Sequence, residues 1–382
     1  MIKHFLLSIL LLSTYLITNL SLAPSQAKSV GHGYDFEGNG KRGRPCFSSV
    51  YTQDNLTLPA KEQVISTPFD TLQKALKRQV LPLNKNANKR WQKAGLKISA
   101  RSQLKQTHAL LTHKKRLQVK DLTAHYKPYL IRGEDGCGNT QFTGYFSPVL
   151  QVKSKPDKIY KYPLYKRPRL WPRGKALTRA QIIQGGLDGR GLELAYSKSL
   201  LDNYFLQVQG SGLAEYIDTG ERITLQYGGQ NGLKYRSLGR YLVDNQYVAA
   251  ENISLDAIRN FFQKHPDKMV PFLNINPSFV FFNKRKQGPT GSLNTEVVSE
   301  VSVAVDPAFI PLGSVLLAEI PKLDAAGRFL KHELRILVAQ DTGGAIRGTG
   351  HVDIYMGAGQ KAQNKASHLH HYGRLWLLLP RP

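Results

Sequence analysis

The chain has 382 residues, of which 53 are Lys or Arg and 27 are Asp or Glu, so its formal net charge is +26. Hydrophobic residues make up 41% of the sequence, which allows a sizeable core and argues against a disordered chain. At about 150 residues per domain, the length predicts about two domains. The charge predicts attraction to nucleic acid, an anionic membrane or an acidic wall polymer, and a solvated basic surface is the alternative. No RNA-recognition or zinc-finger pattern is present, so no nucleic-acid partner is expected.

The N-terminus has the pattern of a secretory signal peptide over residues 1–27. Lys3 and His4 precede an apolar run from Phe5 to about Ala23, and Ser25-Gln26-Ala27 supplies small residues for cleavage. An uncleaved membrane anchor is the alternative. No later stretch is long enough to span a bilayer. The protein is therefore expected to be exported as a soluble monomer, with peripheral association with membrane or wall left open.

The whole chain contains two cysteines, Cys46 and Cys137. In an oxidising compartment they are candidates for one disulfide that closes a long loop, and two buried free thiols are the alternative. Residues 28–65 are rich in Gly, Pro, Ser and Asn and lack periodicity, so loops are expected there.

Two basic helices are predicted before residue 142. The first is expected to have Thr67 as its N-terminal cap and Pro68 in its first turn. Its apolar face is expected to consist of Phe69, Leu72, Leu76 and Val80. The second helix is predicted to begin at Ser102.

From Gln141 onward, short runs bounded by turn signals predict mainly strands. Residues 204–209 have the sequence YFLQVQ, an alternation that indicates a half-buried strand with two amides on one face. A Gly210-Ser211-Gly212 turn follows, and it lacks the lysine and helix of a phosphate-binding loop. Short helices capped by Thr178 and Ser254 interrupt the strands.

Two strands joined by a glycine-rich loop are predicted near the C-terminus. Residues 334–340 are mostly apolar and indicate a buried strand that leads directly into Asp341. In residues 351–356, apolar side chains alternate with His351, Asp353 and Tyr355, which places this aspartate on the polar face of the second strand. Two carboxylates are therefore expected to line one cleft. The alternative is a hairpin whose aspartates only bond turn amides.

A third aspartate, Asp306, ends another alternating run at residues 301–306. If Asp306, Asp341 and Asp353 converge, they cannot all ionise readily, so at least one should have a raised pKa. A carboxyl that stays protonated near neutral pH can act as a general acid on a glycosidic oxygen. Three independent surface aspartates are the alternative.

The aspartate trio, with Gly343-Gly344-Ala345-Ile346-Arg347-Gly348 between its last two members, resembles the three-aspartate (3D) domain. More specifically, the chain resembles the membrane-bound lytic murein transglycosylase A family from about Thr143 to Met356. Further motifs carry this resemblance: Thr143-Gly144-Tyr145-Phe146, Leu206 to Gly212, Asn231-Gly232 with Tyr235 and Gly239-Arg240, Asn276 to Phe282, Gly288-Pro289 with Gly291, and Ala304-Val305-Asp306.

The resemblance implies a mainly β fold, with a double-psi β-barrel domain, an inserted second β-rich domain and few peripheral helices. After the signal peptide, residues 28–142 would form an N-terminal segment whose helices contribute to the barrel domain. Residues 143–287 would form the inserted domain, and residues 288–382 the C-terminal part of the barrel. Residues 288–291 have the composition of a linker.

The resemblance also implies roles for individual residues. Asp353 corresponds to the single catalytic acid/base, and Asp341 and Asp306 to two supporting carboxylates. The motif residues expected to line the glycan groove between the domains are Thr143, Tyr145, Gln209, Gly210, Ser211 and Gly344. No metal or other cofactor is implied. Phe146 and Ser147 stand where the family often has Tyr and Glu, and no lipoprotein box is present, which puts the usual membrane anchor of this periplasmic family in doubt.

The implied activity is lytic cleavage of the β-1,4 bond between N-acetylmuramic acid and N-acetylglucosamine in peptidoglycan glycan strands, giving 1,6-anhydromuramic acid ends. An ordinary glycosidase needs two carboxylates. Here the muramic acid C6 hydroxyl would replace water, so one carboxyl suffices. Two alternatives stay open: a non-lytic wall-binding protein on the same barrel, and a two-carboxylate muramidase that uses Asp353 with Glu215.

Three histidines near the C-terminus, His368, His370 and His371, suggest a zinc site. Their spacing differs from H-E-x-x-H and no acidic ligand lies nearby in the sequence, so a solvated loop is expected instead.

Overall fold

The structure, a computed structural model, describes residues 48–56, 64–93, 95–113, 117–171, 174–249, 253–324, 328–344 and 346–381. The expected signal peptide and Cys46 lie outside these residues, while Cys137 is buried. The chain forms two compact units. The insert unit contains residues 146–289 and 358–363, and the barrel unit contains the described residues up to 145, with 290–357 and those from 364 onward.

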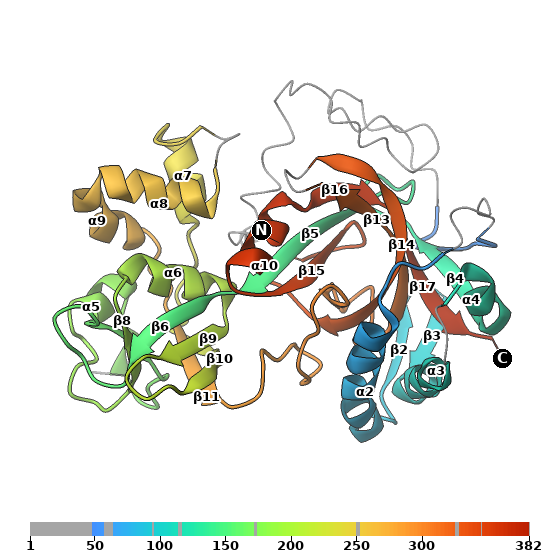
Figure 1. Ribbon diagram of the computed structural model, residues 1–382, viewed down its shortest axis with the longest axis horizontal. Coiled ribbons are helices and arrows are strands. Elements are labelled where there is room, and N and C mark those ends of the chain that lie inside the picture. The colour runs from blue at the N-terminus through green and yellow to red at the C-terminus, as the bar shows by residue number, and fades with distance from the viewer. Residues whose placement is uncertain are drawn as a thin grey trace. The chain divides into compact units, whose positions relative to one another are not determined.

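Nine strands form the sheet of the barrel unit. They are β1 (Tyr51–Gln53), β4 (Tyr126–Ile131), β5 (Thr140–Ser147), β12 (Ser302–Ala304), β13 (Val315–Leu323), β14 (Phe329–Asp341), β15 (His351–Ala358), β16 (His370–Gly373) and β17 (Leu375–Pro380). Their order is β1-β4-β17-β13-β14-β12-β15-β5-β16. In Figure 1, β13, β14, β15 and β5 curve around a common interior. The short β12 lies inside the sheet, between β14 and β15.

The two ends of this sheet meet because β16 leads directly into β17. β16 pairs with β5, and after Arg374 the chain continues as β17, which pairs with β13. The Glu319 amide donates a hydrogen bond to the Arg374 carbonyl at 2.8 Å, which bridges the junction. The strands β13, β14, β12, β15, β5 and β16–β17 therefore nearly close a barrel. The predicted mainly β class is confirmed, and the double-psi crossing of strands stays a prediction.

Three helices cover the barrel sheet: α2 (Phe69–Lys85), α3 (Ala100–Thr112) and α4 (Val119–His125). A hairpin of β2 (Arg90–Lys93) and β3 (Leu96–Ser99) connects the first two. Buried leucines from each helix (Leu72 and Leu76, Leu110, Leu122) join the cluster around Trp376. Each buried leucine contributes about 1.5 to 3 kcal/mol by leaving water. This packing, rather than the basic outer faces, holds the helices in place.

Both predicted helix starts in this region need correction. The N-cap residue of α2 is Pro68, and Thr67 instead exchanges two hydrogen bonds with the backbone of Ile336, accepting from its amide at 2.7 Å. Thr67 thus ties the segment before α2 to strand β14. Helix α3 begins at Ala100 because the side chain of Ser99 accepts from the Ser102 amide at 3.1 Å, so Ser99 is the cap and Ser102 lies inside the helix.

The insert unit is built on a six-stranded sheet. Its strands are β6 (Val149–Lys153), β7 (Tyr162–Tyr165), β8 (Glu193–Ser197), β9 (Gly212–Tyr216), β10 (Arg222–Gln230) and β11 (Val280–Arg285), in the order β11-β10-β9-β6-β8-β7. Its helices are α5 (Arg179–Ile183), α6 (Leu200–Gln209), α7 (Leu238–Asp244), α8 (Leu255–Lys264), the short 3₁₀ turn η5 (Pro266–Lys268) and α9 (Met269–Leu273). Thr178 and Ser254 cap α5 and α8, as predicted.

The strand predicted at residues 204–209 is wrong, because this segment is the second half of helix α6. Ser199 caps the helix by accepting from the Asp202 amide at 3.1 Å, and Gly210 ends it with a φ of 76°. That left-handed conformation favours glycine. The helix is buried on nearly all sides, so its side chains lack a clear 3.6-residue pattern and the short alternation misled the prediction. The cap and the terminal glycine were the informative signals.

Candidate functional site

Asp353 lies in the middle of β15, a strand that has β12 on one side and β5 on the other. Its side chain is only 1% exposed. The Thr143 hydroxyl, from β5, donates a hydrogen bond to Oδ1 of Asp353 at 2.7 Å. Strand pairing fixes both backbones, so the carboxyl is held on a rigid sheet and not on a loop.

Asp341 reaches the same part of the sheet through an irregularity in β14. Residues Val303 and Ala304 of β12 pair with Ala339 and Asp341 of β14, so β14 advances two residues where β12 advances one. Such a bulge changes which way the following side chain points. Ala304 also pairs with Asp353 on its other side. Since directly paired residues share a face of the sheet, the bulge brings Asp341 to the face that carries Asp353.

Several donors surround the Asp341 carboxylate. The Tyr145 hydroxyl donates to Oδ2 at 2.8 Å, and the Ser292 amide and hydroxyl donate to Oδ1 at 2.9 and 3.1 Å. Gly291 makes the Ser292 contacts possible, because a Cβ on it would lie 2.5 Å from the carbonyl oxygen of Gln340. The residue that directly follows the segment expected to be a linker therefore contacts the site.

Burial is the main cause of the pKa shifts of these carboxyls. It raises the pKa of Asp353 to about 7; the Thr143 hydrogen bond opposes this rise and the charge of Asp341 adds to it. The pKa of Asp341 is also raised by burial, against the hydrogen bonds from Tyr145, Thr342 and Ser292. Asp353 can therefore carry a proton near neutral pH, as a general acid must.

Asp306 follows β12 and is 7% exposed. Its Oδ1 accepts from the Ala308 amide at 2.9 Å, and its Oδ2 accepts from the Gly348 amide at 2.8 Å. Both oxygens are thus used to fix backbone, including the loop that joins Asp341 to Asp353. This geometry suits a supporting carboxylate more than one that contacts a reacting atom.

Two histidines, His351 and His370, lie near Thr143, the hydrogen-bond partner of Asp353. His351, two residues before Asp353 on β15, has its Nε2 2.8 Å from the Thr143 hydroxyl. The expectation of a solvated loop is wrong for His370 and His371, because both belong to β16, which pairs with β5. Burial lowers the pKa of His351 and of His370 to about 4 each, and the neighbouring histidine adds to each shift. His368 lies at the end of helix α10 (Gln360–His368) and is exposed.

Over the residues that the structure describes, no three His, Cys, Asp or Glu side chains are grouped to hold a metal ion. For the other predicted site residues, the structure gives the element and the unit to which each belongs. Gln209 and Gly210 end α6 and Ser211 precedes β9, all in the insert unit and all half-buried. Gly344 lies exposed in the loop after β14, in the barrel unit.

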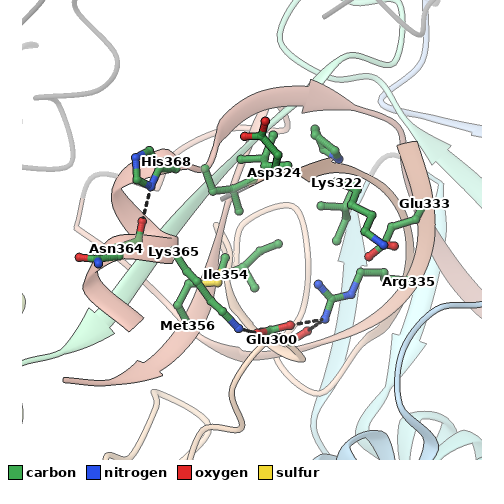
Figure 2. A pocket seen from close by; sticks show the side chains of 14 residues that line it. Glu300, Lys322, Asp324, Glu333, Arg335, Ile354, Met356, Asn364, Lys365 and His368 are labelled. Atoms are coloured by element: carbon green, nitrogen blue, oxygen red, sulfur yellow. Dashed lines mark hydrogen bonds and ion pairs between the residues drawn. The ribbon is translucent and has the colours of Figure 1, made fainter. Parts of the chain in front are cut away.

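The opposite face of β15 borders a separate cavity of about 380 Å³, lined by Ile354 and Met356 among others. Figure 2 shows Arg335 and Lys365 converging on Glu300 at its edge. Glu300 has a φ of 62°, and its amide donates to the Tyr355 carbonyl at 2.6 Å. None of the three aspartates lines this cavity, so the ion-pair network there supports the turn into β12 and is not part of the carboxylate site.

Sequence reasoning missed two contributors to the site. Ser292 directly follows the supposed linker at residues 288–291, and only the glycine at position 291 indicated a close backbone approach there. The hydrogen bond between Tyr145 and Asp341 was also missed, since Tyr145 was expected only to line the glycan groove. In the structure the rings of Tyr145 and Tyr355 pack against each other with centroids 5.2 Å apart, and Tyr355 is 5% exposed.

Comparisons with known proteins match two family models to the chain. The family model described as the MltA specific insert domain matches residues 141–283, and that of the 3D domain matches residues 301–379. Membrane-bound lytic murein transglycosylase A of Escherichia coli K12 is 42% identical over 255 residues, which cover 66% of this chain and 69% of that protein. The Vibrio cholerae protein of the same name is 41% identical over 251 residues, or 65% of this chain and 67% of that protein.

A crystal structure of E. coli MltA with bound chitohexaose has the same fold, with a TM-score of 0.73. It is 31% identical to this chain, and the alignment covers 90% of this chain and 98% of that one. The similarity thus extends over both units of the chain.

Proposed function

The chain belongs to the membrane-bound lytic murein transglycosylase A family, and we propose that it cleaves the β-1,4 bond between N-acetylmuramic acid and N-acetylglucosamine with Asp353 as its single acid/base. As a member of this family, the protein is a peptidoglycan lytic transglycosylase. The substrate is the glycan strand of peptidoglycan, and the products carry 1,6-anhydromuramic acid ends. The residue roles and the products below are part of the proposal.

The observation that carries the proposal is the burial of Asp353 beside Asp341, which keeps the Asp353 carboxyl protonated near neutral pH. In the first step this carboxyl donates its proton to the glycosidic oxygen, and the bond from that oxygen to the muramic acid C1 breaks. In the second step the C6 hydroxyl oxygen of the same sugar bonds to C1, and its proton passes to the Asp353 carboxylate. Water takes no part, so no second catalytic carboxylate is needed.

The surrounding residues support this chemistry in distinct ways. The negative charge of Asp341 favours the protonated form of Asp353 and would later stabilise positive charge that develops at the sugar ring. Asp306 holds the loop between the two aspartates through the Gly348 amide. Tyr145 keeps Asp341 in place. We assign substrate contacts to Thr143, Tyr145, Gln209, Gly210, Ser211 and Gly344.

We also propose that the protein is exported and acts in the periplasm, and that residues 143–287 form the inserted domain and residues 28–142 and 288–382 the barrel domain. The name of the relatives describes them as membrane-bound. None of the helices in the described part of this chain has the length and apolar character to cross a bilayer. The net charge of +26 favours contact with the carboxylates and phosphates of a wall, and that contact should weaken with salt.

Mass spectrometry of digested peptidoglycan tests the reaction. The proposal predicts anhydromuropeptides, whereas hydrated muropeptides would indicate a muramidase and an absence of products would indicate a wall-binding protein. For a muramidase, Glu215 would be the second carboxylate; in the structure it is a partly exposed partner of Arg222 in the insert unit. The variant Asp353→Asn should lose at least about a thousandfold in activity, as expected when the general acid and base are both lost. Full activity in this variant would remove the single-acid mechanism.

A further inference from the structure

The Thr143 hydroxyl lies between two groups that compete for it. Its oxygen is 2.7 Å from Oδ1 of Asp353 and 2.8 Å from Nε2 of His351. The three residues come from two neighbouring strands, since β5 supplies Thr143 and β15 supplies the other two. Thr143 is 2% exposed, so water has little access to replace either contact.

A threonine hydroxyl has one proton to donate and can accept two hydrogen bonds. When Asp353 is ionised, it can only accept, so the Thr143 proton must point to it. The contact with His351 then requires that Nε2 of the imidazole carry a proton and donate it to the hydroxyl oxygen. His351 therefore sets the direction of the Thr143 hydroxyl in the state in which Asp353 has given up its proton.

The surroundings keep His351 neutral, so it acts as a hydrogen-bond donor rather than as a charge. On β15 itself, Asp353 and Tyr355 follow it at alternate positions; β5 contributes Thr143 and Tyr145, β14 contributes Asp341, and β16 contributes His370 and His371. Burial and the nearby His370 both lower the pKa of His351. Burial likewise lowers the pKa of His370, whose Nε2 lies 3.4 Å from the Gln141 amide nitrogen.

We propose that His351 is a positioning residue, which holds the Thr143 hydroxyl with its proton directed at the Asp353 carboxylate formed during cleavage. This inference rests on the proposed function of Asp353. A carboxylate that receives a directed hydrogen bond is stabilised, and the transition state in which the carboxylate forms is stabilised with it. Without His351 the hydroxyl can turn away, so kcat falls. The ionised form of Asp353 is then also less favoured, so the pKa of Asp353 rises.

Two substitutions at this position separate the proposal from a packing role. His351→Gln keeps an N–H donor near the position of Nε2, whereas His351→Leu fills similar space without a donor. We expect kcat of His351→Leu to fall about tenfold, the range of one lost hydrogen bond to a charged group, while KM for purified glycan strands changes little. The alkaline limb of its pH–rate profile should move up by about one pH unit. The His351→Gln variant should retain most of the wild-type kcat, and the alkaline limb of its pH–rate profile should lie at the wild-type pH.

The outcomes are distinguishable. If both variants keep the wild-type kcat and alkaline limb, His351 has no positioning role. If both lose activity equally while their melting temperatures fall together, its role is packing. If Asp353→Asn is fully active, the proposed function itself fails, whatever the His351 variants do. Measuring the three variants together with the wild-type protein therefore tests the inference separately from the function on which it rests.

Discussion

Asp341 and Asp353 pair with the same residue, Ala304, from opposite sides of β12. Only one small side chain of the sheet therefore separates the two carboxyls, and the charge of Asp341 raises the pKa of Asp353. The arrangement divides the work between them. Asp341 accepts hydrogen bonds from four donors on Tyr145, Ser292 and Thr342, which favour its ionised form, whereas Asp353 has a single hydroxyl donor and is suited to hold a proton.

The raised pKa of Asp353 predicts how stability changes with pH. The folded protein keeps this proton up to about pH 7, while an unfolded aspartate loses it near its ordinary pKa of about 3.9. The folded state therefore binds more protons between those values, and its stability should fall as pH rises from about 4 to about 7. Asp353→Asn should remove this loss.

Denaturant unfolding of wild type and Asp353→Asn at a series of pH values measures the effect. The stability of the variant relative to wild type should increase between pH 4 and 7, by on the order of 2 to 4 kcal/mol. Above pH 7 the difference should stay constant. A difference that does not change with pH would show that the carboxyl has an ordinary pKa in the folded protein.

Asp341→Asn should lower activity by about ten- to a hundredfold while glycan binding is kept, because a preorganised charge near the reacting atoms is lost. The pKa of Asp353 should fall once the neighbouring charge is gone. The alkaline limb of the pH–rate profile should then move to lower pH, opposite to the shift expected for His351→Leu. Asp306→Asn is the matched control, since its bonds go to backbone amides of the loop and turn. Unchanged turnover in Asp341→Asn would assign that residue a structural role only.

Replacement of the Thr143 hydroxyl should change kcat without removing substrate binding. Thr143→Val loses the donor to Asp353 but keeps the shape, so kcat should fall about tenfold. Thr143→Ser keeps the hydroxyl and should retain most activity. Steady-state kinetics on purified glycan strands, together with melting temperatures, would measure both variants. Equal activity of the two would indicate that the hydroxyl does not assist Asp353.

The network at Glu300 should affect stability rather than catalysis. Burial alone would raise the pKa of Glu300, but Lys365 and Arg335 outweigh it and lower the pKa. The ion pairs of Glu300 should therefore stabilise the fold above the pKa that Glu300 has in the unfolded chain. This stabilisation should be lost as the pH falls through the lower pKa of Glu300 in the folded protein. Glu300→Gln should reduce stability at pH 7 by about 1 kcal/mol, since the group is partly exposed.

Lys365→Met is the control for this network, because it removes only the more exposed partner of Glu300. It should cost less stability than Glu300→Gln, and both should leave kcat unchanged. A large loss of kcat in either variant, without a loss of stability, would connect this cavity to the catalytic site and contradict its structural assignment.

The sequence alone determined the strands on both sides of the carboxylate loop and the place of Asp353 on its strand, because alternation with period two is a local property. It also contained enough ordered motifs for the family resemblance. The N-caps Pro68 and Ser99, and helix α6 itself, were misjudged, because the caps and burial that decide them compete with equally plausible local patterns.

Only the tertiary structure decided how the site is assembled. The bulge at the end of β14 brings Asp341 to the face of Asp353, and it depends on pairing with a strand almost forty residues away. The partners Thr143, Tyr145 and Ser292 come from segments separated by about 50 to 210 residues from the carboxylates that they contact. Burial, which gives Asp353 its raised pKa, is likewise a property of the whole packed sheet, since it requires neighbours on every side.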